Sequence, residues 1–198
     1  NKKMTIKAIF ATDSVGTFGI DNHLPWPKNK EDMTLFKRMT TGTIVVMGYN
    51  TWQSLGGKPL PDRVNVVVTT GRGLLTGEME VCEINGEHVI FVKPFDLENT
   101  LRWLEDQSNI WTSNDRRWTT NTIFVIGGKS LLIQLAHMFD EVYHTEILGD
   151  YHDNGEDITQ VTINDNELGH ITSCLHKAFF RYLPDGSGKV TAYTKTSK

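Results

Sequence analysis

Short apolar runs separated by polar, glycine-containing segments recur through most of the chain. Runs of this kind, bounded by turn residues, are typical of buried strands. The apolar content of the run at 64–69 further predicts burial on both faces of a sheet. We predict strands at 6–11, 43–47, 64–69, 89–92, 123–126 and 142–147.

Helical periodicity lies between several of these runs. Met33, Phe36 and Met39 recur at i, i+3 and i+6 after Asn29, which predicts a helix capped by Asn29 and ending near Met39. Asp96 is expected to cap a second helix that ends near residue 105. Further helical segments are predicted at 51–55 and 131–138.

The pattern near the end of the sequence predicts a β-hairpin. Residues 179–183 and 189–194 form two strand-like runs joined by Pro184-Asp185-Gly186. The polar stretch 107–121 is interpreted as an inserted surface loop. Strands alternating with helices predict an α/β three-layer sandwich, with a central mixed, largely parallel sheet, helices on both faces and a C-terminal antiparallel hairpin. We expect one domain over residues 1–198.

Composition narrows the function classes. The net charge of −4 gives no reason to expect nucleic acid as a partner. Cys82 and Cys174 are the only cysteines and lack CxxC spacing, so neither a disulfide framework nor a metal or redox site is indicated. No apolar run approaches the roughly 18 residues that span a bilayer. The polar start of the sequence shows no signal peptide, and the expected location is cytoplasmic.

Several catalytic patterns are missing from the sequence. The seven histidines are scattered without HExxH, and no GxSxG elbow occurs. Gly128-Lys129-Ser130 resembles the end of a P-loop, but Ile123 stands where that motif requires glycine. No GxGxxG follows the first strand, so the Rossmann fingerprint is absent too. No metal site is expected.

Gly127-Gly128 separates a predicted strand from a predicted helix. Two glycines there allow close backbone approach, and a helix N-terminus presents free amides, so the segment suits a pyrophosphate. The alternative is a tight turn without a ligand, which the dipeptide alone favours.

Asp32, Arg63 and Trp26 each have a structural and a functional reading. Asp32 lies in the first turn of its helix, where carboxylates commonly cap, yet it shares a face with Met33 and Phe36. A carboxylate on an apolar face is costly unless a partner pairs with it. Arg63 is either a surface residue or a bidentate clamp for a substrate carboxylate. Trp26 fits a core or a lid position.

In their order and spacing, these elements resemble dihydrofolate reductases over most of the chain, from about Ile6 to Tyr193. The motifs that carry the resemblance are Leu24-Pro25-Trp26, Asp32 with Phe36, Met47-Gly48 with Thr51 and Ser54, Pro59-Leu60-Pro61 with Arg63, Ile126-Gly127-Gly128, and Thr145. The enlarged segments at 107–121 and 151–169 resemble those of phage-encoded members.

The resemblance implies reduction of 7,8-dihydrofolate to tetrahydrofolate by hydride from NADPH, in one-carbon metabolism and nucleotide synthesis. It implies catalytic roles for Asp32, Trp26 and Thr145. Substrate contacts are implied for Ile9, Ala11, Met33, Phe36, Leu60 and Arg63. Cofactor contacts are implied for Gly19, Ile20, Leu24, Gly48, Tyr49, Asn50, Thr51, Ser54, Thr69, Thr70, Arg72, Ile126, Gly127, Gly128, Lys129, Ser130 and Leu131.

Tyr49 departs from the family pattern, which has Arg or Lys there as a contact for the 2′-phosphate of NADPH. Asn50, Thr69 and Thr70 offer hydrogen bonds nearby, and Arg72 offers a replacement cation. We therefore expect a preference for NADPH that depends on Arg72. The alternative is that Arg72 is a solvated loop residue.

The expected partners are dihydrofolate and antifolate-type inhibitors, with neither nucleic acid nor a membrane. We expect a monomer and leave a homo-oligomer open. Two other functions stay open as well. One is a reductase of the same fold acting on another pterin or pyrimidine, and the other is a non-catalytic structural protein that retains the fold.

Overall fold

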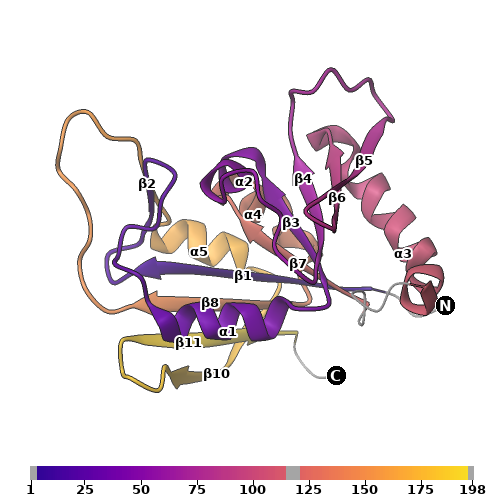
Figure 1. The fold of residues 1–198 in the computed structure, drawn as a ribbon. Coiled ribbons are helices and arrows are strands. Elements are labelled where there is room, and N and C mark those ends of the chain that lie inside the picture. Colours follow the sequence, from indigo (N-terminus) through magenta and orange to yellow (C-terminus); the bar gives the residue numbers. More distant parts are fainter. Residues whose placement is uncertain (1–3, 115–120, 196–198) are drawn as a thin grey trace. The chain divides into compact units, whose positions relative to one another are not determined.

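The computed structural model describes residues 4–114 and 121–195 (Figure 1). Two compact units are distinguished within it. Unit 1 contains Thr40–Gly128 together with the start of the chain up to Thr5. Unit 2 contains Ile6–Met39 and the chain from Lys129 onwards.

Unit 1 is built mainly from parallel strands. They pair in the order β7-β3-β4-β6-β5, and only β5 and β6 are antiparallel. β4 is buried along its whole length, as its apolar pattern predicts. The elements are β3 (Ile44–Gly48), α2 (Tyr49–Ser54), β4 (Val64–Val68), β5 (Met79–Ile84), β6 (Glu87–Val92), the 3₁₀ helix η1 (Pro94–Asp96), α3 (Leu97–Asn114) and β7 (Thr122–Gly127).

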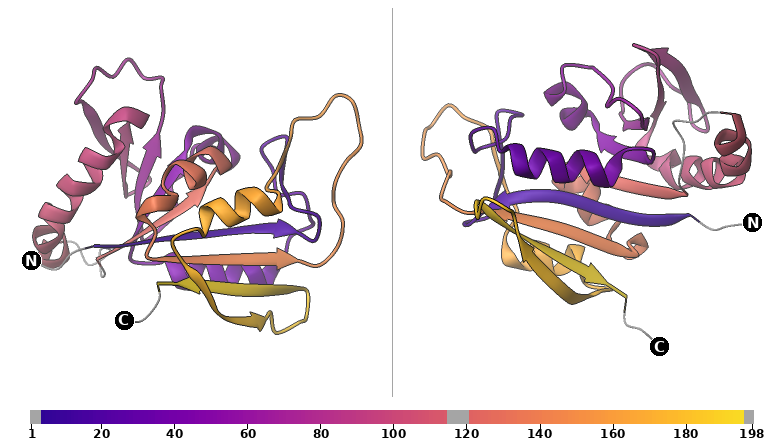
Figure 2. Two further views of the ribbon diagram at one scale, coloured as in Figure 1. Left: turned by 180° about the vertical axis from the view of Figure 1, so that it is seen from behind. Right: turned by 60° about the horizontal axis from the view of Figure 1, so that its bottom comes forward.

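Unit 2 has a mixed sheet in the order β10-β11-β8-β1. β1 and β8 are parallel, and the last two strands are antiparallel to their neighbours. Figures 1 and 2 show α1 and α5 on opposite faces of this sheet. The elements are β1 (Thr5–Asp13), β2 (Thr17–Ile20), α1 (Lys30–Thr40), α4 (Lys129–Gln134), the 3₁₀ helix η2 (Ala136–Met138), β8 (Glu141–Ile147), β9 (Gln160–Thr162), α5 (Asp165–Ile171), β10 (His176–Tyr182) and β11 (Gly188–Thr194).

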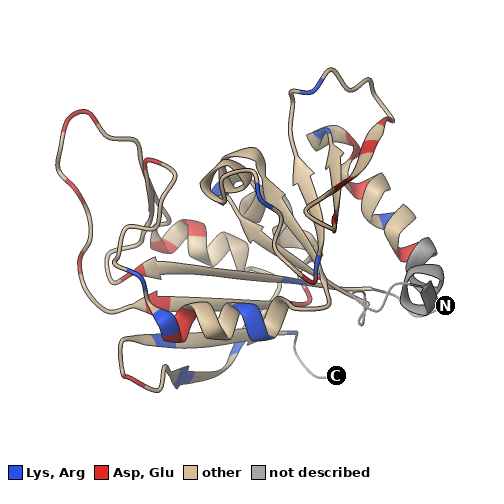
Figure 3. Ribbon diagram, in the orientation of Figure 1, with Lys and Arg blue, Asp and Glu red and all other residues tan. Residues whose placement is uncertain are grey.

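The predicted α/β class is confirmed, with mixed, largely parallel pairing and a C-terminal antiparallel hairpin. The predicted start of α1 is confirmed as well, because the Asp32 backbone N–H donates to Asn29 Oδ1 at 3.0 Å. Acidic residues occupy the first turn of α1 and basic residues its last turn, which complements the helix dipole (Figure 3). Capping and dipole therefore both favour a helix here.

The sequence analysis missed the hairpin of β5 and β6. The two strands are joined by Asn85 and Gly86, which have φ of +52° and +80°. Asn-Gly is the strongest short-range signal for a two-residue hairpin, because both positions require positive φ. The polar, partly exposed pattern of β5 gives a weak strand signal and explains the omission.

The interpretation of 107–121 as a loop is wrong for its first half. α3 continues to Asn114, while residues 115–120 lie outside the described residues. The stretch that follows Glu105 contains neither Gly nor Pro before Asn121, so nothing in it stops the helix. α3 begins directly after Asp96, as predicted, but Asp96 itself is part of the 3₁₀ helix η1. Its Oδ2 accepts from the Gly77 backbone N–H at 2.9 Å.

Two other elements of unit 2 were not predicted. β2 pairs antiparallel with β9, which lies about 140 residues further along the chain, and no local pattern predicts such a pairing. α5 has a capping box, in which Asn164 Oδ1 accepts from the Glu167 N–H and the Glu167 carboxylate accepts from the Asn164 N–H. That Asn-x-x-Glu spacing is a readable helix start.

β10 is the edge strand of the unit 2 sheet, and all of its residues are exposed. Its exposed side chains include Phe179, Phe180 and Tyr182. Its pairing with β11 shifts register between Lys177 and Phe179, which marks a β-bulge. The last hairpin therefore has an irregular outer edge.

Asp13 ends β1 as a buried carboxylate, only 2% exposed. Its Oδ1 accepts from the backbone N–H groups of Val15 and Thr17, at 3.0 and 2.7 Å. Its Oδ2 accepts from the Tyr151 N–H at 2.7 Å. One side chain thus joins the loop after β1 to a segment more than a hundred residues away, through three charge-assisted hydrogen bonds.

We expect Asp13→Asn to destabilise the fold by about 1–3 kcal/mol, because an amide offers one acceptor oxygen and turns its NH₂ towards a remaining donor. Asp13→Ala should cost at least as much. The measurement is urea unfolding. Asp150→Asn is the matched control, since its exposed carboxylate accepts a single bond from His152, and it should change stability by less than about 0.5 kcal/mol. Equal effects of the two Asn variants would contradict this role.

Candidate active site

Asp32 and Thr145 form the polar centre of unit 2. Burial raises the pKa of the Asp32 carboxyl, and a hydrogen bond from the Thr145 side chain partly opposes that rise. Thr145 is 2% exposed on β8. α1 and β8 thus bring together two residues predicted from separate motifs.

Trp26 packs on the face of the sheet to which Thr145 belongs. It is 5% exposed and forms an apolar cluster with Ile147 and Leu183, against which Ala11 also packs. Ala11 of β1 is the register partner of Thr145 on β8, so the two lie on the same face of the sheet. The predicted residues Trp26, Ala11, Thr145 and Asp32 therefore belong to one neighbourhood.

The Trp26 indole carries a donor that the protein does not use. Its Nε1 is buried and has no hydrogen-bond partner within the described part of the chain. A buried N–H costs free energy unless a ligand or an ordered water accepts from it. The atom marks a place where a polar partner from outside the protein is favoured.

Apolar side chains continue the site along β1 and α1. Ile9 is 5% exposed, and Phe36 is partly buried. Met33 is 47% exposed, although it directly follows Asp32, which is partly buried. An exposed methionine beside a desolvated acid suits a flat, partly apolar ligand.

His144 precedes Thr145 but belongs to the opposite face of β8. It forms a 2.7 Å hydrogen bond with Thr12 Oγ1 and stacks on Phe10. Burial, followed by the charge of Lys189, lowers the pKa of His144 to about 4. A neutral, stacked imidazole on the far face does not serve as the acid of this site.

Gly19, Ile20 and Leu24 lie in or just after β2. A tight turn connects Ile20 and His23, whose backbones exchange hydrogen bonds of 2.9 and 2.8 Å. Leu24 is 58% exposed. The segment leading to Trp26 is therefore anchored at the turn and presents an open apolar side chain.

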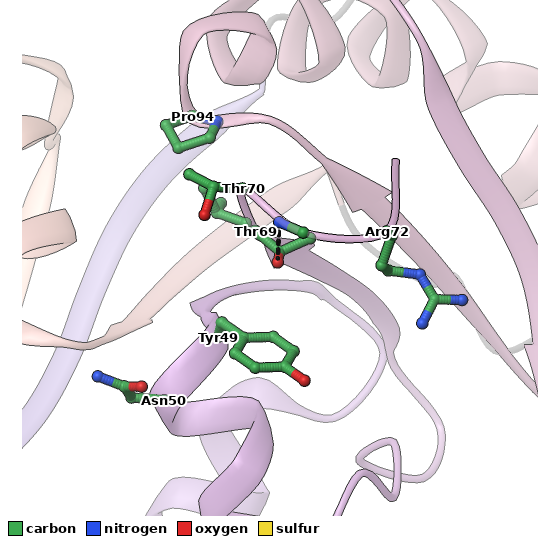
Figure 4. A pocket seen from close by; sticks show the side chains of 8 residues that line it. Tyr49, Asn50, Thr69, Thr70, Arg72 and Pro94 are labelled. Carbon is green, nitrogen blue, oxygen red and sulfur yellow. Dashed lines mark hydrogen bonds between the residues drawn. The ribbon is translucent and has the colours of Figure 1, made fainter. Parts of the chain in front are cut away.

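A cavity of about 480 Å³ lies in unit 1 (Figure 4). It is lined by Tyr49, Asn50, Val68, Thr69, Thr70, Gly71, Arg72 and Pro94. The two threonines follow β4, and Tyr49 begins α2 directly after β3. Because parallel strands end at the same edge of a sheet, these polar groups gather there. The structure thus brings together the predicted cofactor residues around Tyr49 and around Thr69.

Gly48 and Gly128 lie close together in the same unit. A Cβ added to Gly48 would meet the Gly128 backbone nitrogen at 3.5 Å and the Gly127 oxygen at 3.8 Å. Met47 is the register partner of Gly127, which follows Ile126 on β7. The two glycine-containing strand ends therefore lie side by side without a side chain on Gly48, Gly127 or Gly128.

The remaining predicted cofactor residues make other contacts in this structure or are buried. The Lys129 ammonium donates to the Thr162 carbonyl at 2.8 Å. It also forms an ion pair with Glu167, which partly neutralises its charge. Leu131 is buried in α4. Ser54 Oγ donates to the Thr51 carbonyl at 2.6 Å within α2. Contacts from these residues and from exposed Ser130 stay predictions.

Arg63 is held from two sides inside unit 1. It is 5% exposed, its Nε donates to the Pro61 carbonyl at 2.8 Å, and NH1 donates to Thr40 Oγ1 at 2.9 Å. Burial lowers the pKa of this guanidinium. These bonds use two of the five N–H donors and fix the plane of the group. The surface-residue reading of Arg63 is therefore wrong.

Asn65 was missed by the sequence analysis. Its Oδ1 accepts from the Leu60 N–H at 2.9 Å, and its Nδ2 donates to the Leu60 and Arg63 carbonyls at 3.1 Å each. The residue is fully buried in β4 and shapes the segment of Leu60. A single amide in an otherwise apolar buried strand is the signal that could have revealed it.

Arg72 lies at the cavity but has a partner. Its guanidinium donates two hydrogen bonds to Glu80, of 2.8 and 2.7 Å. Arg72 is thus an exposed loop residue, as one of the two interpretations expected, but its guanidinium is paired with Glu80, which was not anticipated. No cluster of potential metal ligands occurs among the residues that the structure covers.

Comparisons with known proteins agree on one family. Residues 5–173 match the model of the family described as "Dihydrofolate reductase". A type 8 dihydrofolate reductase of Escherichia coli is 31% identical over 165 residues, covering 76% of this chain and 87% of that protein. The dihydrofolate reductase of Bacillus subtilis is 32% identical over 151 residues, covering 74% of each.

A shorter match is closer in sequence. It is to a bifunctional dihydrofolate reductase-thymidylate synthase of Paramecium tetraurelia, with 49% identity over 65 residues, or 33% of this chain and 14% of that protein. Among solved structures, dihydrofolate reductase of Enterococcus faecalis complexed with NADP(H) and RAB-propyl superposes with a TM-score of 0.66 and 21% identity, covering 98% and 97% of the two chains. That likeness shows the fold.

Asp32→Asn is expected to stabilise the protein at neutral pH. Because burial raises the Asp32 pKa above 3.8, the folded chain binds this proton more tightly than the unfolded chain. The contribution is fully present below the ordinary pKa and is lost as the pH rises through the raised one. The variant should therefore have the higher urea midpoint at pH 7, and the difference should shrink as the pH falls through the raised pKa and vanish below 3.8, where both states carry the proton. A variant less stable than wild type at pH 7 would contradict the desolvation of Asp32.

Proposed function

The chain belongs to the dihydrofolate reductase family, and from this premise we propose that its two groups of site residues serve the two ligands of that reaction. The pterin group is Asp32, Thr145, Trp26 and Ala11. The cofactor group lines the cavity of unit 1. The reaction reduces 7,8-dihydrofolate to tetrahydrofolate, for one-carbon metabolism and nucleotide synthesis.

The reduction adds a hydride to C6 and a proton to N5 of the pterin, which saturates one imine bond. NADPH, when bound, supplies the hydride. The protein's own contribution is to orient the pterin, exclude bulk water and favour positive charge on the ring.

Asp32 is the residue that favours the cationic pterin. Its carboxylate pairs with the 2-amino group and the N3 side of the ring, and Thr145 holds it by a hydrogen bond. Because the group is largely desolvated, its attraction for a cation is stronger than in water. A water molecule carries the proton to N5, since a carboxylate paired with the 2-amino and N3 edge lies across the ring system from N5.

Trp26 and the segment before it control access of water. The unpartnered Nε1 of Trp26 supports a polar contact to substrate or to an ordered water in the loaded site. The segment from Gly19 to Trp26, with exposed Leu24, closes over the ligands and opens for product release.

The unit 1 cavity fits the adenosine side of NADPH. Asn50, Thr69 and Thr70 provide neutral hydrogen-bonding groups, and the glycine-containing strand ends at Gly48 and Gly128 suit a pyrophosphate. Tyr49 stands where the family usually has a cation, which leaves Arg72 as the guanidinium at the cavity. The residues present therefore match the cofactor, with less positive charge than the family pattern.

One observation carries the proposal most strongly. A desolvated carboxylate, hydrogen-bonded to a buried threonine and next to a tryptophan with an unused donor, is costly for a protein that binds nothing. The test is the absorbance loss of NADPH with dihydrofolate as substrate. Turnover of another pterin or pyrimidine instead would identify a different reductase, and turnover of none would favour a structural protein.

We further propose that the enzyme acts as a monomer on small molecules in the cytoplasm. Both cysteines are free, which agrees with a reducing compartment. No helix within residues 4–114 and 121–195 is long and apolar enough to cross a membrane. The Enterococcus enzyme was solved with RAB-propyl beside NADP(H), and we propose antifolate-type compounds as further ligands of this chain.

Asp32→Asn should lower kcat for dihydrofolate at pH 7 by about 10²–10⁴-fold, the usual range for a lost acid–base group, while the fold is kept. The amide still accepts from Thr145 but cannot complement a cationic pterin. Glu31→Gln is the matched control, because it removes the neighbouring carboxylate in the same helical turn and should leave kcat near wild type. Near-normal turnover of Asp32→Asn would overturn the role of this acid.

Arg63→Ala should weaken binding of substrates that carry a glutamate tail, by about 1.5–3 kcal/mol, and leave a tail-less pterin almost unaffected. It should also lower the urea midpoint, because Pro61 and Thr40 lose their buried donor. Thr40→Val separates the two effects, since it removes one partner and keeps the guanidinium. Fluorescence titration with both ligands provides the measurement. Equal losses for the two ligands would show that Arg63 is only structural.

A further inference from the structure

Arg72 and Glu80 form a bidentate ion pair. Nε of Arg72 donates to Oε2 of Glu80 at 2.8 Å, and NH2 donates to Oε1 at 2.7 Å. Both carboxylate oxygens and one full edge of the guanidinium are therefore engaged. Each residue favours the charged form of the other, since the hydrogen bond from Arg72 lowers the pKa of Glu80 and raises that of Arg72.

Strand register places Phe91 next to both members of this pair. Glu80 of β5 is the antiparallel register partner of Phe91 on β6, so the two side chains project from the same face. The Arg72 guanidinium lies 3.8 Å from the centre of the Phe91 ring, which is 1% exposed. The carboxylate and the ring together hold the cation in one orientation.

The local backbone also limits where Arg72 can go. Arg72 has φ of +66°, and Gly73 after it has +64°. In Figure 4 the guanidinium points away from the hydroxyls of Thr69 and Thr70, and the Tyr49 hydroxyl points towards its side of the cavity. The guanidinium at this cavity is thus turned aside from the neutral donors.

A phosphate group that enters the cavity must compete with Glu80. Carboxylates and phosphates both bind the fork of an arginine in a bidentate manner, so one edge cannot serve both. The carboxylate also offsets the charge that would attract a dianion. Since the pair is 39% exposed on each side, it is weak enough to be opened by a ligand, at a cost in affinity.

We propose that Glu80 is a specificity-determining residue for the nicotinamide cofactor. By holding Arg72 on Phe91, it lowers the affinity of the cavity for a phosphate on the adenosine 2′-oxygen and so narrows the preference for NADPH over NADH. This inference rests on the proposed cofactor role of the unit 1 cavity.

The experiment measures binding of two cofactor fragments by calorimetry. Adenosine 2′,5′-bisphosphate carries the 2′-phosphate, and adenosine 5′-monophosphate lacks it. Glu80→Gln should tighten the bisphosphate about three- to fivefold, the size of an exposed ion pair, and leave the monophosphate unchanged. Arg72→Leu should weaken the bisphosphate alone, and adding Glu80→Gln to it should restore little, because Glu80 acts through Arg72.

Glu83→Gln is the matched control. Glu83 lies on the same strand, is exposed, and belongs to the opposite face, so it changes net charge equally without touching Arg72. It should leave both affinities unchanged. An equal gain from Glu83→Gln would reduce the effect to general charge and overturn the proposal. A loss of bisphosphate binding in Glu80→Gln, or no change, would overturn it as well.

Steady-state kinetics with dihydrofolate keeps the two proposals apart. The ratio of kcat/KM for NADPH to that for NADH should rise about three- to fivefold in Glu80→Gln. If wild type oxidises neither cofactor, the proposed function fails, and the fragment affinities still decide the role of Glu80. If wild type is active and the ratio stays constant across the variants, the function stands and the role of Glu80 is overturned.

Discussion

The parallel pairing of β3 with β4 and β7 is the constraint on which the polar cavity of unit 1 depends. These strands are buried over most of their length, so their side chains supply core and no chemistry. Polar groups are tolerated only where the strands end, and parallel strands end together. Gly48, Thr69 and Gly128 follow from this arrangement, and so does the cavity beside them. The function of this unit is confined to one edge by the requirement that its interior stay apolar.

In unit 2, Asp32 lies in the acidic first turn of a helix and is also largely removed from water. The helix needs an acidic first turn and an Asn29 cap, while catalysis needs a carboxylate withdrawn from water. Both needs are met because α1 directs that turn at Thr145, which returns one hydrogen bond to the acid. Desolvation of the carboxyl lowers stability in the folded state, while the role that we propose for Asp32 needs that same withdrawal from water. On that proposal, stability and activity are opposed at this residue.

Much of the fold could be predicted from the sequence, because apolar strands, capping residues and glycine pairs are local signals. The buried strands, the start of α1 and the last hairpin follow from such signals. Asn65 and the Asn85-Gly86 turn had readable signals that were overlooked. The pairing of β2 with β9, and Glu80 as partner of Arg72, depend on register between segments, which no local pattern specifies. Asp32 and Thr145 were joined only through the family motif, since 113 residues separate them.

The outer edge of β10 has a consequence for how the molecule behaves in a crowded solution. An edge strand with several exposed aromatic rings invites other chains to add to the sheet and grow into aggregates. The bulge between Lys177 and Phe179 interrupts the regular ladder that such growth requires. Lys177 and Arg181 add like charges that repel a second copy of the same strand. A local irregularity and two cations at this outer strand therefore favour the colloidal stability of the chain.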